Sequence, residues 1–260
     1  MATTRRRLIA LLSALLTVGL YGCHGGAAKP QEPHTLRVLT YNIHHGEGTD
    51  ERFDYKRLAR VINDLSPDIV ALQEVDRGTE RASGVDQAAL LGKLCKMHHA
   101  FGQAMPYQGG RYGEAVLSRF PIEKVNVHPL PFNLEREPRA ALEVRVEIKG
   151  IGPLVFVGTH LCHQDDELRT LQTRRMSRLF DKEEGPPIIL AGDFNARPGS
   201  DPMNVLLQDG WTDVVAPRSR IDYILVRAAD PWQVKELTIL DEPVASDHDP
   251  VLAVLEWQGE

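Results

Sequence analysis

The sequence predicts an α+β fold in which mixed or antiparallel sheets carry their helices on the outside. About nine strand-like segments stand beside only a few helical ones. Several neighbouring strand-like segments are joined by connections too short for a crossover helix, which argues against a fully parallel sheet. With 42% hydrophobic residues in a chain of 260, there are enough apolar side chains for a sizeable core.

Each strand-like segment is an apolar or alternating run. These runs cover residues 35–42, 69–74, 114–118, 141–148, 154–160, 187–195, 221–226, 232–240 and 250–257. No repeat or internal linker interrupts them, so we expect residues 36–260 to form one domain.

Four segments have the pattern of helices. Residues 53–65 repeat apolar side chains at helical spacing and stop before Pro67, and residues 85–97 form a second candidate. A short fourth helix is expected to begin at the cap-forming Ser200. In the third, the residues expected to face inward are Leu168, Leu171, Leu179 and Phe180.

The N-terminal residues have the composition of an export signal. Three arginines precede an apolar run of roughly 13 residues, which is short beside the roughly 20 needed to cross a bilayer. We therefore expect residues 1–22 to be a signal peptide and residues 23–35 a flexible tether. The order Leu-Tyr-Gly-Cys ending at Cys23 resembles a bacterial lipobox, which implies acylation of Cys23. Plain secretion and an uncleaved anchor stay open as alternatives.

The charge of the exported form limits its partners. Without residues 1–22 the chain keeps 27 basic and 36 acidic residues, a net charge of −9. An acidic protein has no general attraction to polyanions, so nucleic acid is not the favoured partner, although a local basic patch is compatible with it. A monomer in the cell envelope, anchored through Cys23 and facing the periplasm or the exterior, is the expected form.

Polar residues suited to catalysis lie at the ends of the buried strand-like runs. Strand ends on a rigid scaffold can bring such side chains to one cleft without burying unpaired charge. The residues in question are Asn42, Glu74, His160, Asp193, Asn195, Asp222, Asp247 and His248.

These positions fall within a series of motifs. The segments YNIHHG, LQEVD, YGEAVLSRFPI, REPRAAL, GTHL, GDFNARPGS, IDYI and SDHDPV, in this order, resemble the motif series of the endonuclease/exonuclease/phosphatase superfamily, also called deoxyribonuclease I-like. The resemblance covers residues 36–257. It implies a four-layer α/β/β/α sandwich of two packed sheets and metal-dependent hydrolysis of phosphate esters.

The expected metal ligands are Asn42, Glu74 and Asp247, whose hard oxygen atoms suit Mg²⁺ or Mn²⁺. The resemblance implies that Asp193 orients or deprotonates the attacking water and that Asn195 holds this water or a phosphate oxygen.

The same resemblance gives His248 the role of phosphate donor, oriented and kept cationic by Asp222. His160 would stabilise or protonate the leaving oxygen. Glu114 matches the carboxylate that pairs with this histidine in deoxyribonuclease I itself. For the arginine that contacts the scissile phosphate, Arg136 and Arg139 both fit known variants of the motif.

Three functions follow from the sequence. The first is a metal-dependent phosphoesterase acting on a small or lipid-linked phosphoester, favoured by the complete site, the expected anchor and the acidic charge. The second is a secreted nuclease, favoured by Glu114 and the REP segment. The third, a catalytically silent binding module, is hard to reconcile with the intact set of ligands.

Overall fold

The computed structural model describes residues 34–181 and 185–259. The predicted signal peptide, Cys23 and most of the tether lie outside the described residues. The first strand, β1, begins at His34 and pairs His34 and Thr35 with the last strand, so these two residues, expected in the tether, belong to the folded unit. No helix in the described part is long and apolar enough to cross a membrane.

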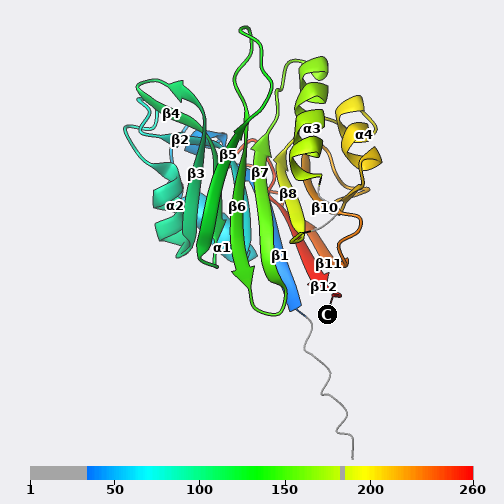
Figure 1. Cartoon of the computed structure of the whole chain (residues 1–260). Helices are drawn as coiled ribbons and strands as arrows, with labels where there is room; N and C mark the ends of the chain where they lie inside the picture. The colour runs from blue at the N-terminus through cyan, green and yellow to red at the C-terminus, as the bar shows by residue number, and fades with distance from the viewer. Residues whose placement is uncertain (1–33, 182–184, 260) are drawn as a thin grey trace, which may run out of the picture. The chain divides into compact units, whose positions relative to one another are not determined.

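Two six-stranded sheets form the body of the protein (Figure 1). The first sheet has the order β11-β12-β1-β2-β4-β3 and the second the order β5-β6-β7-β8-β10-β9. The first consists of β1 (His34–Asn42), β2 (Ile69–Arg77), β3 (His98–Tyr107), β4 (Gly110–Ser118), β11 (Trp232–Ile239) and β12 (Val251–Trp257). The second consists of β5 (Ile122–Pro129), β6 (Ala140–Ile148), β7 (Gly152–His160), β8 (Ile188–Asp193), β9 (Trp211–Asp213) and β10 (Asp222–Arg227).

Both sheets are mixed, and each is built around one parallel pair. In the first sheet β1 runs parallel to β2, and in the second β7 runs parallel to β8. A helix crosses over within each pair, because parallel neighbours need a long connection. The helices are α1 (Tyr55–Leu65), α2 (Gln87–Cys95), α3 (Asp166–Phe180) and α4 (Asp201–Gln208), with a short 3₁₀ turn η1 (His44–Gly46) after β1.

Three apolar clusters hold four layers together. The central cluster lies between the inner faces of the sheets and includes Val38 and Phe156. A second joins α1 and α2 to the outer face of the first sheet, and a third joins α3 and α4 to the outer face of the second. The order of layers is therefore α/β/β/α, as the sequence predicts (Figure 1).

The sequence pattern did not predict three of the strands, β3, β5 and β9. All three are edge strands. An edge strand has fewer neighbours, and its side chains are only partly buried, so the apolar run that marks a central strand is weak or missing. In β5, for example, Val125 and Val127 are exposed although they lie in a strand.

The third helix faces the core differently from the expectation. Leu171 is half exposed, so its predicted inward position is wrong. The buried side of α3 includes Gln172 instead, whose side-chain oxygen accepts from the backbone N–H of Cys162 at 2.9 Å and whose amide nitrogen donates to the carbonyl of Pro131 at 2.9 Å. These two hydrogen bonds satisfy the backbone N–H of Cys162 and the backbone carbonyl of Pro131, both in loops. A polar residue therefore occupies a buried position that helical spacing alone would assign to an apolar one.

The central cluster should dominate stability. Replacing the fully buried Phe156 by Ala is expected to lower the free energy of unfolding by about 3–5 kcal/mol, through lost burial and the cavity left behind. Urea denaturation followed by tryptophan fluorescence measures this change.

Phe132 is a matched control, since the same aromatic side chain is there 53% exposed. Phe132→Ala should alter the free energy of unfolding by no more than about 0.5 kcal/mol. Equal losses for the two variants would contradict the central position of Phe156.

Candidate active site

Residues from both sheets meet at the end of the sandwich where the parallel strands finish. The register of the second sheet pairs His160 with Asp193 and Asp193 with Asp222, so three adjacent strands carry these residues in one row. Residues paired in register point to the same face of a sheet. In the first sheet, Asn42 ends β1 and Glu74 lies near the end of β2. The strand-end pattern in the sequence thus corresponds to one site.

Asp193 is the centre of the site and is almost fully buried. Its Oδ2 accepts from Nδ2 of Asn42 at 3.3 Å and lies 3.5 Å from Nε2 of His160 and 3.7 Å from Nε2 of His248. Its Oδ1 accepts from the backbone N–H of Asn195 at 2.8 Å. Burial, together with the charge of Asp222, raises the pKa of Asp193 to about 7.

Asn195 reaches the site through a left-handed backbone conformation, with φ of 48°. Asn adopts this conformation at a lower cost than most residues. Its Nδ2 donates to the carbonyl of Leu161 at 3.1 Å and lies 2.9 Å from Nε2 of His160. The turn after β8 therefore directs Asn195 back toward the row of catalytic candidates.

His248 and Asp222 form the contact expected from the sequence. Nδ1 of His248 lies 3.0 Å from Oδ2 of Asp222. Burial by itself would lower the pKa of His248, but the hydrogen bond and charge of Asp222, with the charges of Asp193 and Asp247, raise that pKa to about 9. His248 is therefore an imidazolium at neutral pH, with Nδ1 engaged and Nε2 directed toward Asp193.

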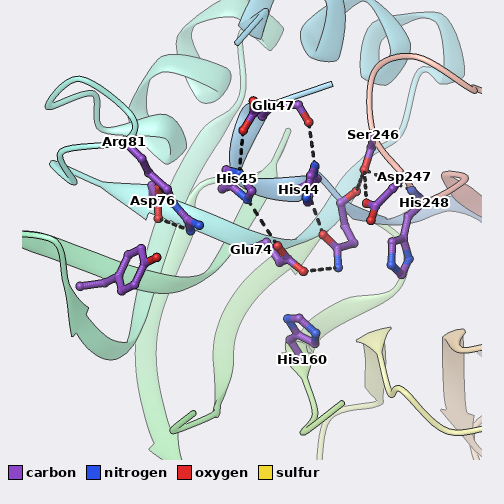
Figure 2. A network of polar contacts seen from close by, with 12 residues as sticks. His44, His45, Glu47, Glu74, Asp76, Arg81, His160, Ser246, Asp247 and His248 are labelled. Carbon is purple, nitrogen blue, oxygen red and sulfur yellow. Dashed lines mark hydrogen bonds and ion pairs between the residues drawn. The ribbon is translucent and has the colours of Figure 1, made fainter. Parts of the chain in front are cut away.

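Glu74 is directed into the cleft by a β-bulge. The pairing of β2 with β4 shifts register between Leu72 and Val75, and Glu74 has a φ of 59°, in the left-handed region. Its Oε1 accepts from Nδ2 of Asn42 at 3.1 Å, and its Oε2 lies 3.7 Å from Nδ1 of His45 (Figure 2). Burial would raise the pKa of Glu74, yet His45 and Asn42 hold that pKa well below its usual range, so Glu74 is ionised.

Asp247 lies next to Ser246 and His248 on the loop that precedes β12 (Figure 2). Ser246 fixes the loop, since its hydroxyl donates to the backbone carbonyl of Asn42 at 2.7 Å and also contacts Oδ1 of Asp247 at 3.4 Å. Asp247 is exposed, unlike Asn42. Two carboxylates and a carboxamide, one of the carboxylates held ionised, are a donor set that fits a hard divalent cation.

Asp193, Asp222 and His248 also stand close enough together to suggest a metal site, with one ligand atom from each within 4.8 Å of the others. A protonated imidazole has no free lone pair for a metal, however. Because the pKa of His248 is raised to about 9, the three residues are better described as an imidazolium between two carboxylates.

His160 does not pair with Glu114, so this prediction is wrong. Its Nδ1 lies 2.9 Å from Nη1 of Arg139, which is 3% exposed. Arg can only donate, so Nδ1 accepts and the proton of the neutral ring is on Nε2, which lies 3.5 Å from Oδ2 of Asp193. The 2.9 Å approach of Nδ2 of Asn195 to this Nε2 is then a contact between two donors and not a hydrogen bond. Burial, followed by the charge of Arg139, holds the pKa of His160 well below its usual range, and the ring is neutral.

Glu114 is fully buried, and neither of its carboxylate oxygens has a hydrogen-bond partner in the described part of the chain. Burial raises the pKa of Glu114 well above its usual range, although the charge of Arg139 opposes this. The sequence pattern placed Glu114 correctly in a strand. It could not show that Arg139, and not Glu114, would contact Nδ1 of His160.

The two candidate arginines differ in their position relative to the site. A cavity of about 340 Å³ is lined by Asp193, His160 and other residues of the site, although not by Asn42, Asp222 or Asp247. Arg139 lines it, whereas Arg136 does not. Arg136 is partly exposed and donates to the carbonyl of the neighbouring Glu135 at 3.1 Å. No role is predicted from the sequence for five of the residues that line this cavity. They are Arg81, Met105, Tyr107, Glu137 and His163, none of which ends a predicted strand.

Comparison with known proteins agrees with this geometry. Residues 39–248 match the Endonuclease/Exonuclease/phosphatase family. The chain belongs to this family. It is also 27% identical to YbhP of Escherichia coli K12, an alignment that covers 84% of this chain and 95% of YbhP.

Solved structures share the fold. An endonuclease/exonuclease/phosphatase from Beutenbergia cavernae superposes with a TM-score of 0.72 and 27% identity, over 86% of this chain and 72% of that one. The mannosyl-6-phosphatase Bt3783 of Bacteroides thetaiotaomicron superposes with a TM-score of 0.67 and 20% identity, over 85% and 99%. The latter likeness is one of fold.

The charge of His248 should depend on its carboxylate partner. In Asp222→Asn, the pKa of His248 is expected to fall from about 9 toward its ordinary value, because the negative charge on the Nδ1 side is lost. Histidine proton signals followed by NMR across pH 5–10 measure the change.

A second histidine–carboxylate pair provides the control. Nε2 of His128 lies 2.6 Å from Oε2 of Glu143, and neither residue lines the cavity that contains the site. Glu143→Gln should leave the titration of His248 unchanged. If His248 titrates identically in the Asp222→Asn protein and the unaltered protein, Asp222 does not keep the ring of His248 charged.

Proposed function

We propose that this protein is a Mg²⁺- or Mn²⁺-dependent phosphoesterase that hydrolyses a small or lipid-linked phosphoester with an activated water. The observation that carries the proposal is the buried Asp193, which contacts Asn42 of one sheet and lies close to His160 and His248. This arrangement has a base, two donors and an adjacent set of hard oxygen ligands. Membership of the family supports it, and the phosphatase activity in the name of the Bacteroides neighbour is consistent with it.

Each residue of the site has a separate role in the proposed hydrolysis. Asp193, with a pKa of about 7, is suited to accept a proton from water near neutral pH. His248 donates from Nε2 to a phosphate oxygen, because its Nδ1 is engaged by Asp222. Asn195 holds the water or a phosphate oxygen. A divalent cation bound by Asn42, Glu74 and Asp247 would neutralise charge on the phosphate oxygens.

His160 is assigned a narrower role than the sequence implied. With Nδ1 accepting from Arg139, the ring is neutral and offers only Nε2–H. It can therefore stabilise the leaving oxygen or another phosphate oxygen by a hydrogen bond, whereas full protonation of the leaving group would require an imidazolium. The positive charge near this end of the phosphate comes from Arg139.

A nuclease is the second candidate, but two features that favoured it receive no support. Glu114 makes no hydrogen bond to His160, and Arg136 does not line the cavity. The acidic charge of the chain is also unfavourable for a polyanion. Plasmid DNA therefore belongs in the substrate panel as the test of this alternative, and a silent binding module would turn over nothing in it.

Removing the proposed base should abolish turnover. With Mg²⁺ or Mn²⁺, we expect hydrolysis of a generic phosphodiester or phosphomonoester, and Asp193→Asn should lower kcat by about 10²–10⁴-fold without unfolding the protein. EDTA should stop the reaction, and added Mg²⁺ or Mn²⁺ should restore it. Phosphate or nitrophenol release, compared with plasmid nicking and sphingomyelin cleavage, gives the rates.

Asp249→Asn is the matched control for this experiment. Asp249 is the neighbour of His248, but its Oδ1 only accepts from the backbone N–H of Glu242 at 3.3 Å. Its substitution should change kcat by less than about threefold. Metal-dependent turnover that persists in Asp193→Asn at the rate of the unaltered protein would remove Asp193 from the mechanism.

We also propose that the protein is an exported monomer held in the cell envelope by lipid on Cys23, facing the periplasm or the exterior. In a bacterial host, labelled palmitate should be incorporated and the protein should sediment with membranes. Cys23→Ser should lose both properties, because the acylated atom is gone. Cys95 and Cys162 are buried and free, so Cys162→Ser serves as the control and should keep the label. Equal labelling of Cys23→Ser would contradict lipidation at this position.

A further inference from the structure

One end of the cavity has no part in the proposed chemistry. There the wall is formed by Arg81, Met105, Tyr107 and Tyr112, which we call the arginine–tyrosine subsite. Figure 2 shows Arg81 and its partner Asp76 on the side of Glu74 and His45 that faces away from His248. A phosphate held near Asp193 would therefore leave the rest of its ester to extend toward this subsite.

Arg81 is held rigidly in place. Its Nε and Nη2 donate to the two carboxylate oxygens of the fully buried Asp76 at 2.6 and 3.0 Å, and Thr79 donates to the same carboxylate at 2.8 Å. The guanidinium also lies over the rings of Tyr107 and Tyr112, with its central carbon 4.6 and 5.4 Å from the ring centroids. A side chain fixed in this way loses little further entropy when it binds a ligand.

The charge of this subsite argues against a second anionic group. Asp76 neutralises Arg81, Glu137 pairs with Arg139 at 2.9 Å, and the same cavity contains the carboxylate of Glu74. Nη1 of Arg81 takes no part in the bonds to Asp76, so it remains a donor. Arg81 as a donor and the phenol of Tyr107, which lines the same cavity and can accept, match hydroxyl groups, which both donate and accept.

The shape of the subsite argues against a flat base. The rings of Tyr107 and Tyr112 are tilted by 54° with centroids 6.1 Å apart, so they form no parallel slot, and the guanidinium of Arg81 already lies over both. Met105 and Tyr107 offer apolar contact to the C–H groups of a non-planar ring. The cavity, at about 340 Å³, is near the small end of ligand pockets, which suits one ring with its phosphate.

We propose that the arginine–tyrosine subsite binds a hydroxylated ring, a sugar or a cyclitol, carried on the phosphoester, with Arg81 as the residue that selects it. This inference rests on the proposed function, since it assumes that the phosphate lies near Asp193. The ring has two sources with the same chemistry, a free sugar phosphate and a lipid headgroup.

Binding rather than turnover tests the subsite. Full-length Asp193→Asn protein, with Mg²⁺ and in mild detergent, is titrated calorimetrically with methyl phosphate and with glucose 6-phosphate. We expect glucose 6-phosphate to bind at least about tenfold more tightly than methyl phosphate. Adding Arg81→Lys should bring the two dissociation constants within about twofold and leave that of methyl phosphate unchanged, because Lys cannot reproduce the stacked, forked guanidinium.

Arg227 provides the matched control for Arg81. It also stacks on an aromatic ring, 4.8 Å from the centroid of Trp211, and pairs with Asp181 at 2.8 Å, but it does not line this cavity. Adding Arg227→Lys to the Asp193→Asn protein should preserve the preference for glucose 6-phosphate. A preference lost equally in the Arg81→Lys and Arg227→Lys proteins would overturn the assignment.

Further arms distinguish the source and the occupant. In the lipid experiment, phosphatidylinositol in phosphatidylcholine vesicles replaces glucose 6-phosphate, and vesicles of phosphatidylcholine alone replace methyl phosphate. The proposal is supported if either ring-bearing ligand binds more tightly than its ring-free counterpart and if Arg81→Lys removes this preference. The absence of both preferences overturns it. So does Arg81-dependent binding of adenosine monophosphate that is tighter than that of the ring phosphates. Since none of these readouts needs turnover, they are independent of the substrate panel that tests the proposed function.

Discussion

The site depends on a hydrogen bond that joins the two sheets. Nδ2 of Asn42, at the end of β1, donates to Asp193, at the end of β8. The same amide group donates to Glu74, and the backbone carbonyl of Asn42 accepts from Ser246. One residue thus connects the proposed base, a proposed metal ligand and the loop that carries His248. Because Asn42 is almost fully buried, the relative position of the sheets and the geometry of the site are fixed together.

Two histidines lie beside the same aspartate but have opposite charge states. Nδ1 of His248 faces the carboxylate of Asp222, and Nδ1 of His160 faces the guanidinium of Arg139. The first partner favours the imidazolium, and the second excludes it. The site therefore holds one charged and one neutral donor near Asp193. Their identical side-chain chemistry gives no hint of this difference, which comes from the deeper burial of His160 and from the residue on the far side of each ring.

The sequence predicted the central strands and their ends well, because these positions carry continuous apolar runs followed by a polar residue. Asn42, His160, Asp193 and Asp222 all met in the site for this reason. Edge strands such as β3 and β5 were missed, since half-exposed strands lack that pattern. Leu171 was misplaced because Gln172 makes two buried hydrogen bonds that hydrophobic spacing cannot reveal.

Contacts between side chains that are far apart in the sequence could not be predicted either. Whether Glu114 or Arg139 would reach the ring of His160 depends on how two strands of different sheets pack, and no local pattern encodes it. Arg81 likewise gains its position from Asp76 and from two tyrosines far along the chain.

The order of strands in the first sheet has a consequence for how the protein matures. β12 is the last strand described, yet it lies between β11 and β1, the first strand of all. Until residues 251–257 are inserted, the sheet has a gap beside β1, and the loop with Asp247 and His248 is not held from its C-terminal side. Folding from the N-terminal side alone cannot produce a working site. The residues of the site can therefore come together only after this strand has closed the sheet, when nearly all of the described chain is present.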